Sequence, residues 1–102
     1  MNNGMRPIHP GEILREEFLE PLDMSVNALA RELRVDATRM NDIVRERRRV
    51  TSDTALRLSQ FFGTTPEFWM NLQRDYDLKT LAASEEGASI RRDIKPRTHQ
   101  AA

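Results

Sequence analysis

The side chains best suited to binding chemistry gather between positions 25 and 50 of this 102-residue chain. Residues 34–49 hold six arginines and three acids, and the run Arg47-Arg48-Arg49 closes the segment. The whole chain has a net charge of zero, so its basic charge is local. A phosphate backbone responds to such a local cluster, and arginine presents a rigid fork of donors that matches phosphate and guanine. This segment is therefore a candidate nucleic-acid contact.

Catalytic and metal-binding chemistry finds little support in the residue types. The two histidines, His9 and His99, lack the spacing of a metal site or an acid–base pair. We interpret them as surface residues, with the alternative that His9 helps to start the first helix. The chain has no cysteine, which excludes a disulfide, a thiolate zinc site and a cysteine nucleophile. Its four glycines are isolated and form no phosphate loop. We expect no enzyme, no cofactor and no metal.

Helices must position the candidate residues, because apolar residues recur at helical spacing and no strand pattern is found. An all-α fold is predicted, with five helices over residues 12–21, 26–33, 37–44, 52–62 and 66–83. An N-cap residue precedes four of these segments: Ser25, Asp36, Thr51 (or Ser52) and Thr65. We expect a flexible lead-in over 1–10, one domain over 11–83 and a flexible tail over 84–102.

The predicted core follows the apolar face of each helix. On the last helix, Phe68, Trp69, Leu72 and Tyr76 are assigned to the core, with a dimer contact as the alternative. The other expected core residues are Ile13, Leu14, Phe18, Val26, Leu29, Ala30, Leu33, Val35, Met40, Ile43, Val44, Ala55, Leu56, Leu58 and Phe62.

The helices predicted over 26–33 and 37–44 are joined so closely that they must cross sharply, as in a helix-turn-helix centred on residues 25–46. With Met40, Ile43 and Val44 inward, the opposite side of the second helix presents polar and arginine side chains suited to a major groove. Arginine can bond guanine, asparagine can bond adenine, and the arginine run after the helix suits phosphates. The predicted DNA-binding set is Ser25, Asn27, Ala37, Thr38, Arg39, Asn41, Asp42, Arg45, Arg47, Arg48 and Arg49.

The alternative for this segment is an ordinary helical hairpin with a solvated polar face. Within the helix-turn-helix itself, Asp36 and Asp42 place negative charge near the expected phosphates; Asp36 is explained as a helix cap, and Asp42 is expected to pair with Arg39 or Arg45 along the helix.

Three stretches resemble the HigA-type antitoxins over residues 7–80: His9-Pro10-Gly11-Glu12-Ile13-Leu14, the segment from Ala55-Leu56-Arg57-Leu58 to Gln73, and Tyr76-Asp77-Leu78. The most specific part is GTTPEFWMNLQ, residues 63–73, because helix physics does not demand its order. The helix-turn-helix in between is of the phage-repressor-like (XRE) type. The chain departs from the family at Arg45-Glu46, where an Asn-Gly pair is common.

The resemblance implies an antitoxin of a type II toxin–antitoxin pair. Such a protein binds and blocks a RelE- or HigB-like ribonuclease toxin, and as a homodimer it represses its own operon. Glu16, Glu17 and Glu20 are the candidate toxin contacts. The alternatives are that these glutamates only form a solvated helix face, or that the toxin binds the tail instead. The candidate dimer contacts are Trp69, Met70 and Leu81. A stand-alone XRE-type transcriptional regulator, and an enzyme or a purely structural helical module, are the competing hypotheses.

The apolar runs of the chain are short, none exceeding three residues. A transmembrane helix needs about 20 apolar residues and a signal peptide about 7–15. Neither is therefore predicted, and the expected location is the cytoplasm by default.

Overall fold

The computed structural model describes residues 6–97, and over this range the chain forms helices and loops without a strand. The first helix is continuous from Pro10 to Leu22, with α1 (Pro10–Ile13), a π-helical stretch η1 (Leu14–Leu19) and α2 (Glu20–Leu22) in sequence. The remaining helices are α3 (Val26–Leu33), α4 (Ala37–Val44), α5 (Ser52–Phe62), α6 (Pro66–Ala82) and α7 (Glu85–Asp93). The all-α prediction with a helix-turn-helix is confirmed, and His99 lies outside the described residues.

The first helix differs from its prediction at both ends. It begins at Pro10 because the His9 side chain caps it, accepting a hydrogen bond of 2.9 Å from the Gly11 N–H. It also continues through Pro21 to Leu22. Proline removes a donor and crowds the carbonyl of the preceding turn. The wider π-helical turn, in which the Glu20 N–H bonds to the Arg15 carbonyl, lies directly before that proline.

A sixth helix, α7, occupies residues predicted to form a tail. Ser84 caps it by accepting from the Gly87 N–H at 3.1 Å, and glutamates in its first turn face the positive end of the helix dipole. Gly87 is buried, and a Cβ there would lie 2.0 Å from the Leu81 carbonyl oxygen. The low apolar content hid this helix, whereas its capping residues were visible in the sequence.

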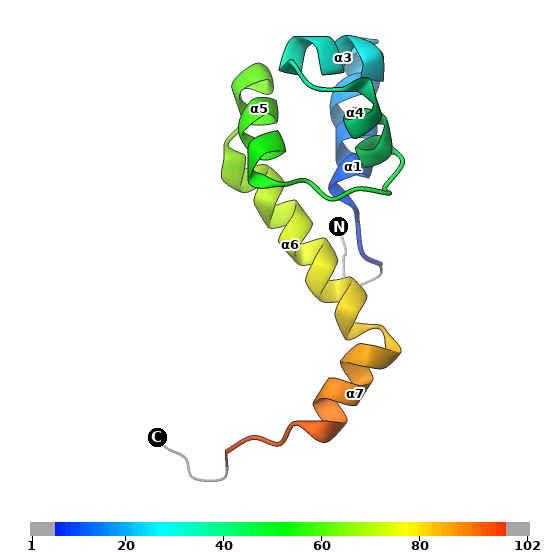
Figure 1. Ribbon diagram of the computed structural model, residues 1–102, viewed down its shortest axis with the longest axis vertical. Helices are drawn as coiled ribbons and strands as arrows, with labels where there is room; N and C mark the ends of the chain where they lie inside the picture. The colour runs from blue at the N-terminus through cyan, green and yellow to red at the C-terminus, as the bar shows by residue number, and fades with distance from the viewer. Residues whose placement is uncertain (1–5, 98–102) are drawn as a thin grey trace.

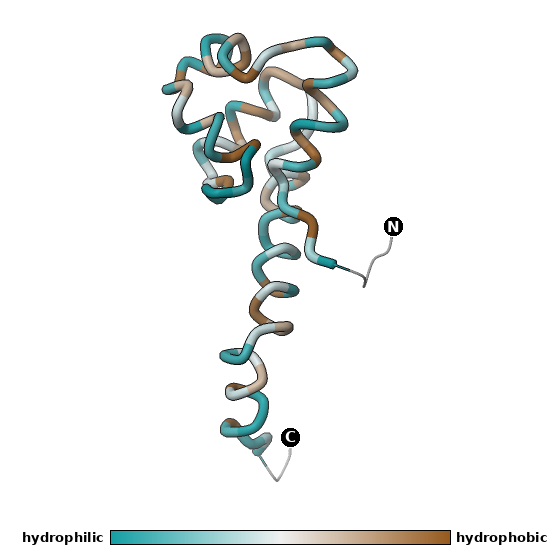
Figure 2. The backbone as a smooth tube through the Cα atoms, turned by 90° about the vertical axis from the view of Figure 1, so that its right-hand side faces the viewer, coloured by the Kyte–Doolittle hydropathy of each residue, from teal (hydrophilic) through white to brown (hydrophobic). Residues whose placement is uncertain are grey.

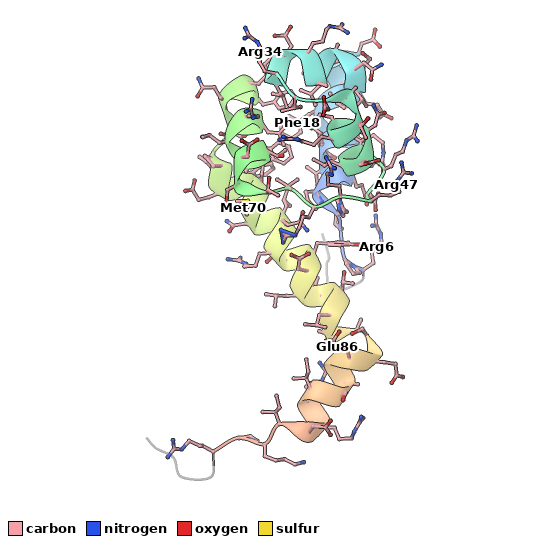
Figure 3. The ribbon with its side chains drawn as sticks, viewed as in Figure 1. Arg6, Phe18, Arg34, Arg47, Met70 and Glu86 are labelled. Atoms are coloured by element: carbon pink, nitrogen blue, oxygen red, sulfur yellow. The ribbon has the colours of Figure 1, made fainter. Side chains whose placement is uncertain are left out.

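The helices pack into a head, formed by residues 6–77, and an arm, formed by residues 78–97, which leaves the head along α6 (Figure 1). Hydrophobic residues concentrate in the head and are scattered along the arm (Figure 2). Phe18 points into the centre of the head, where its ring centroid lies 4.8 Å from that of Phe62 and 5.1 Å from that of Trp69 (Figure 3). None of the described helices is long and apolar enough to cross a membrane.

Three core assignments need correction. Ile13 is half-buried and lies outside the core cluster and the residues packed against it. On α5, Leu56 is 60% exposed, whereas Ala55 and Leu58 are fully buried as predicted. On α6, Trp69 is the fully buried residue and Phe68 is 37% exposed. The Trp69 indole N–H donates to the Thr64 hydroxyl at 2.8 Å, so the buried ring keeps its polar atom satisfied. On α6 the polar and apolar faces are weakly separated, so periodicity alone does not fix the rotation of that helix.

Candidate nucleic-acid interface

Helices α3 and α4 form the helix-turn-helix through a turn without glycine. Ser25 caps α3 by accepting from the Ala28 N–H at 3.0 Å. Arg34 ends it in a left-handed conformation, with φ 62° and ψ 43°. The Val35 N–H bonds back to the Ala30 carbonyl and the Arg34 N–H to that of Arg31, the pattern of a Schellman turn. Asp36 occupies the N-cap position of α4, but its side chain makes no capping hydrogen bond, contrary to prediction.

The outer face of α4 is the part of this motif that can reach a groove. Thr38 and Arg45 are exposed, and Asn41 is half-buried. The Asn41 amide donates to the Asn27 side-chain oxygen at 3.2 Å and to the Ala37 carbonyl at 2.9 Å. These bonds bring predicted residues of α3 and α4 together and fix the Asn41 side chain before any ligand arrives.

The arginine loop, residues 45–51 between α4 and α5, starts with a second Schellman turn. Glu46 takes φ 65°, the conformation that glycine would adopt most easily. The Glu46 N–H bonds to the Ile43 carbonyl, and the Arg47 N–H bonds to the Asp42 carbonyl at 2.8 Å. This turn folds Arg47 back onto α4, so Asp42 pairs with Arg47 at 3.0 Å. The predicted pairing of Asp42 with Arg39 or Arg45 is wrong.

The arginines of the interface divide into paired and unpaired groups. Arg39 pairs with Asp53 at 2.7 Å, and Arg49 pairs with Asp77 at 2.5 Å. Hydrogen bonds from Arg57 and Arg39 lower the pKa of Asp53. Within residues 6–97, by contrast, Arg45 and Arg48 have no carboxylate within 4.0 Å and are exposed. Their charges are therefore available to a phosphate or a base edge.

A hollow of about 250 Å³ lies where the arginine loop meets the start of α5. Its lining combines three guanidinium groups with two threonines and one carboxylate, from Arg39, Arg48, Arg49, Thr51, Thr54 and Asp53. Helix N-termini favour anions, and arginine is the side chain best matched to phosphate. The interface thus combines a polar helix face with an adjoining basic hollow.

Several known proteins are similar to this chain in sequence and in fold. A helix-turn-helix family model matches residues 15–69. Virulence-associated protein I of Dichelobacter nodosus is 50% identical over 88 residues, which cover 86% of this chain and 82% of that protein. The Pseudomonas aeruginosa antitoxin HigA, solved with the higBA promoter, is 54% identical, with a TM-score of 0.86 over 89% of this chain and 98% of that one.

A HigA-family addiction module antidote protein from Coxiella burnetii is 50% identical over 91% of this chain and all of that one, with a TM-score of 0.84. The chain belongs to the HigA family. Members of this family are helix-turn-helix antitoxins rather than enzymes, which confirms the expectation that the protein is not an enzyme.

The predicted toxin and dimer contacts of this HigA-family protein lie on helices other than α4. Glu16, Glu17 and Glu20 are exposed on the first helix, where Glu16 pairs with Arg15 at 3.4 Å. Of the suggested dimer residues, Trp69 is fully buried in its own protomer, which leaves it no surface for a partner. Met70 packs partly against the core, and Leu81 is 39% exposed on the arm.

Sequence reasoning missed three contributors to the interface. Arg57 donates to the Leu33 carbonyl at 2.7 Å and to Asp53, so it ties α5 to the end of α3. Gln73 and Asp77 contact the arginine loop from α6. The only available signal for the latter two was their place in the family-like segments of α6. His9 is buried rather than on the surface, and its ring lies 4.8 Å from that of Tyr76.

Proposed function

We propose that this protein is the antitoxin of a type II toxin–antitoxin module and that it represses its own operon by binding operator DNA. The observation that carries the proposal is the exposed face of α4, with unpaired Arg45 beside it and Arg48 in the adjoining loop. That face occurs in a chain 54% identical to an antitoxin solved with its promoter. In this role α4 enters the major groove and the arginine loop contacts phosphates, which places the protein in the cytoplasm with the DNA.

Two arginine substitutions test this assignment. Arg48→Ala should weaken binding to operator and random DNA alike and reduce the salt dependence by about one charge, because a phosphate contact carries no sequence information. Arg45→Ala should cost about 1–3 kcal/mol on the operator and relax the preference at one base pair. Arg74→Ala, an exposed arginine on α6 paired with Asp75, is the matched control. Equal affinity of the native protein for operator and random DNA would refute operator recognition.

We further propose that the arm forms a homodimer contact. Leu78, Leu81, Ile90 and Ile94 are exposed there, at 60%, 39%, 41% and 68%. The arm has no core of its own to cover these side chains, and a second copy supplies both an apolar partner and the second half-site that a helix-turn-helix protein needs. Half-sites one DNA turn apart, about 34–36 Å, are expected.

The double variant Leu78→Glu/Ile90→Glu should sediment as a monomer at concentrations where the native protein is dimeric, with the melting temperature of the head unchanged. Leu56→Glu, an equally exposed leucine on the head, is the control and should leave the dimer intact. A dimer that survives the arm variant, or that Leu56→Glu dissociates, would move the contact to the head.

The proposed protein partner is a basic ribonuclease toxin, bound at the acidic first helix. Glu17 and Glu20 are exposed there, and Glu20 and Asp23 also line a hollow of about 380 Å³. The rest of its lining is formed by Leu19, Met24, Val26, Ser25 and Arg15. An acidic surface beside apolar side chains suits a protein that carries positive charge for its RNA substrate.

Charge reversal at Glu17 and Glu20, which have no ion-pair partner among the described residues, should abolish co-purification with the neighbouring gene product while the ratio of operator to random DNA affinity stays unchanged. Reversal of Glu85 and Glu86 on the arm is the control. If the neighbouring gene product fails to co-purify with the native protein at low salt, the stand-alone regulator becomes the better proposal.

A further inference from the structure

Helix α6 reaches the arginine loop through two side chains, Gln73 and Asp77. Gln73 is 2% exposed, and its Oε1 accepts from the Val50 N–H at 2.6 Å. Its Nε2 donates to Asp77 Oδ1 at 2.9 Å, while Asp77 Oδ2 accepts from the Arg49 guanidinium at 2.5 Å. One chain of hydrogen bonds therefore holds both the loop backbone at Val50 and the side chain of Arg49.

The outer part of this hydrogen-bond network, the pair of Arg49 and Asp77, contributes little to the stability of the fold, which points to a role in positioning. The side chains of Arg49 and Asp77 are 53% and 44% exposed, and exposed ion pairs are weak. The pair does, however, hold Arg49 at the basic hollow that Arg39 and Arg48 also line. Gln73 ends the segment 63–73, whose order helix physics does not demand, and Asp77 lies in the family-like stretch Tyr76-Asp77-Leu78. The contact with the arginine loop supplies a physical reason for both residues.

We propose that Gln73 and Asp77 are positioning residues that determine DNA specificity, a role that rests on the proposed operator binding. A held Arg49 fits a phosphate at only one position relative to α4, so it favours the duplex that α4 can also read. Binding to other DNA depends mainly on net positive charge, and there the Asp77 carboxylate opposes binding by neutralising Arg49 and repelling phosphates. The two residues thus strengthen operator binding and weaken binding to all other DNA.

Asp77→Asn separates these effects, because asparagine still accepts from Gln73 but no longer pairs with Arg49. Dissociation constants are measured for the DNA upstream of the gene and for a random duplex of equal length over a salt series. We expect the random duplex to bind about two- to five-fold more tightly, with a salt slope up to about 0.9 larger. The operator should bind about three- to ten-fold more weakly once Arg49 is free to move.

The matched control is Asp75→Asn, which makes the same charge change on α6 at a residue paired only with the exposed Arg74. It should leave the ratio of operator to random affinity unchanged. A second variant, Gln73→Glu, keeps an acceptor for the Val50 N–H but sets a carboxylate against Asp77. It should weaken operator binding at least about three-fold without strengthening random binding. Thermal unfolding of each variant shows that the head remains folded.

The proposal is tested by how Asp77→Asn changes the affinity for the operator relative to the affinity for random DNA. If Asp77→Asn strengthens operator and random binding equally, Asp77 only reduces charge and the proposal is wrong. If both weaken equally, or neither changes, the contact is only structural and the proposal is also wrong. A native protein without preference for the operator would refute operator recognition itself, before any variant is compared, and this inference with it.

Discussion

Replacing Gly11 by alanine tests whether a direct backbone contact sets the position of α4. Gly11 lies in the first turn of α1, and a Cβ built on it would lie 1.8 Å from the carbonyl oxygen of Ile43 and 2.8 Å from its carbon. Ordinary contact begins at 3.4 Å, so α1 and α4 would have to separate by about 1.6 Å. The obstacle is the backbone of α4, which cannot rotate away as a side chain would.

Two opposing effects set the magnitude for Gly11→Ala. Alanine improves helix propensity by up to about 1 kcal/mol, whereas overpacking in a tight contact costs about 1–3 kcal/mol, and a backbone obstacle belongs at the upper end. The net loss of about 2 kcal/mol corresponds to a fall in melting temperature of about 8–16 °C for a domain of this size. Operator affinity should fall as well, because α4 shifts relative to the arginine loop.

Thermal unfolding followed by circular dichroism, together with operator binding, measures both effects of Gly11→Ala. Gly63→Ala is the control: a Cβ there meets nothing within 4 Å, so only its positive φ of 76° costs energy. That control should destabilise by about 1 kcal/mol and leave operator affinity unchanged. A fall of less than about 4 °C for Gly11→Ala, with normal operator binding, would refute the claim that this contact positions α4.

Three further outcomes are expected. Burial lowers the pKa of His9 in the folded protein, so the unfolded chain binds more protons as the pH falls. The free energy of unfolding therefore has its full contribution from His9 above about pH 6.5 and loses it as the pH drops toward the folded pKa. His9→Asn keeps a capping side chain but should make the free energy of unfolding less dependent on pH between about pH 7.5 and 5. The same slope against pH in the variant and the native protein would contradict this. Arg34→Gly should raise stability by about 1 kcal/mol in denaturant titrations because Arg34 is left-handed, whereas the helical control Arg31→Gly should lower it by a similar amount. Ser84→Ala should lose about 1 kcal/mol of helix stability in α7, seen as faster amide exchange there but not in the head.

The helix-turn-helix was predictable because its constraints are local. Leu29, Leu33, Met40 and Ile43 recur at helical spacing, and the short join between α3 and α4 leaves one way to bury them all. Residues of α5 and α6 were less predictable, because their rotation depends on packing between distant segments. Leu56 faces outward for this reason, although its neighbours and its chemistry suggest a core residue.

Ion pairs of the interface were beyond prediction for the same reason. Arg39 meets Asp53 and Arg49 meets Asp77, fourteen and twenty-eight residues apart in sequence. Periodicity relates residues three or four apart on one helix, so it suggests partners such as Arg45 for Asp42. The observed partner, Arg47, becomes available only after the chain has turned back at Glu46.

The turn at Glu46 departs from the family-like sequence pattern and adds an ion pair to the arginine loop. The family-like pattern suggests glycine at this position, and Glu46 adopts the left-handed conformation that glycine would supply, at φ 65°. Its side chain then pairs with Arg15 at 3.3 Å, and Arg15 also donates to the Val44 carbonyl at the end of α4. Glutamate at this position therefore has a strained backbone, but its side chain connects the arginine loop to the first helix through Arg15. A glycine at this position would relieve the strain but would remove the ion pair between the arginine loop and the first helix.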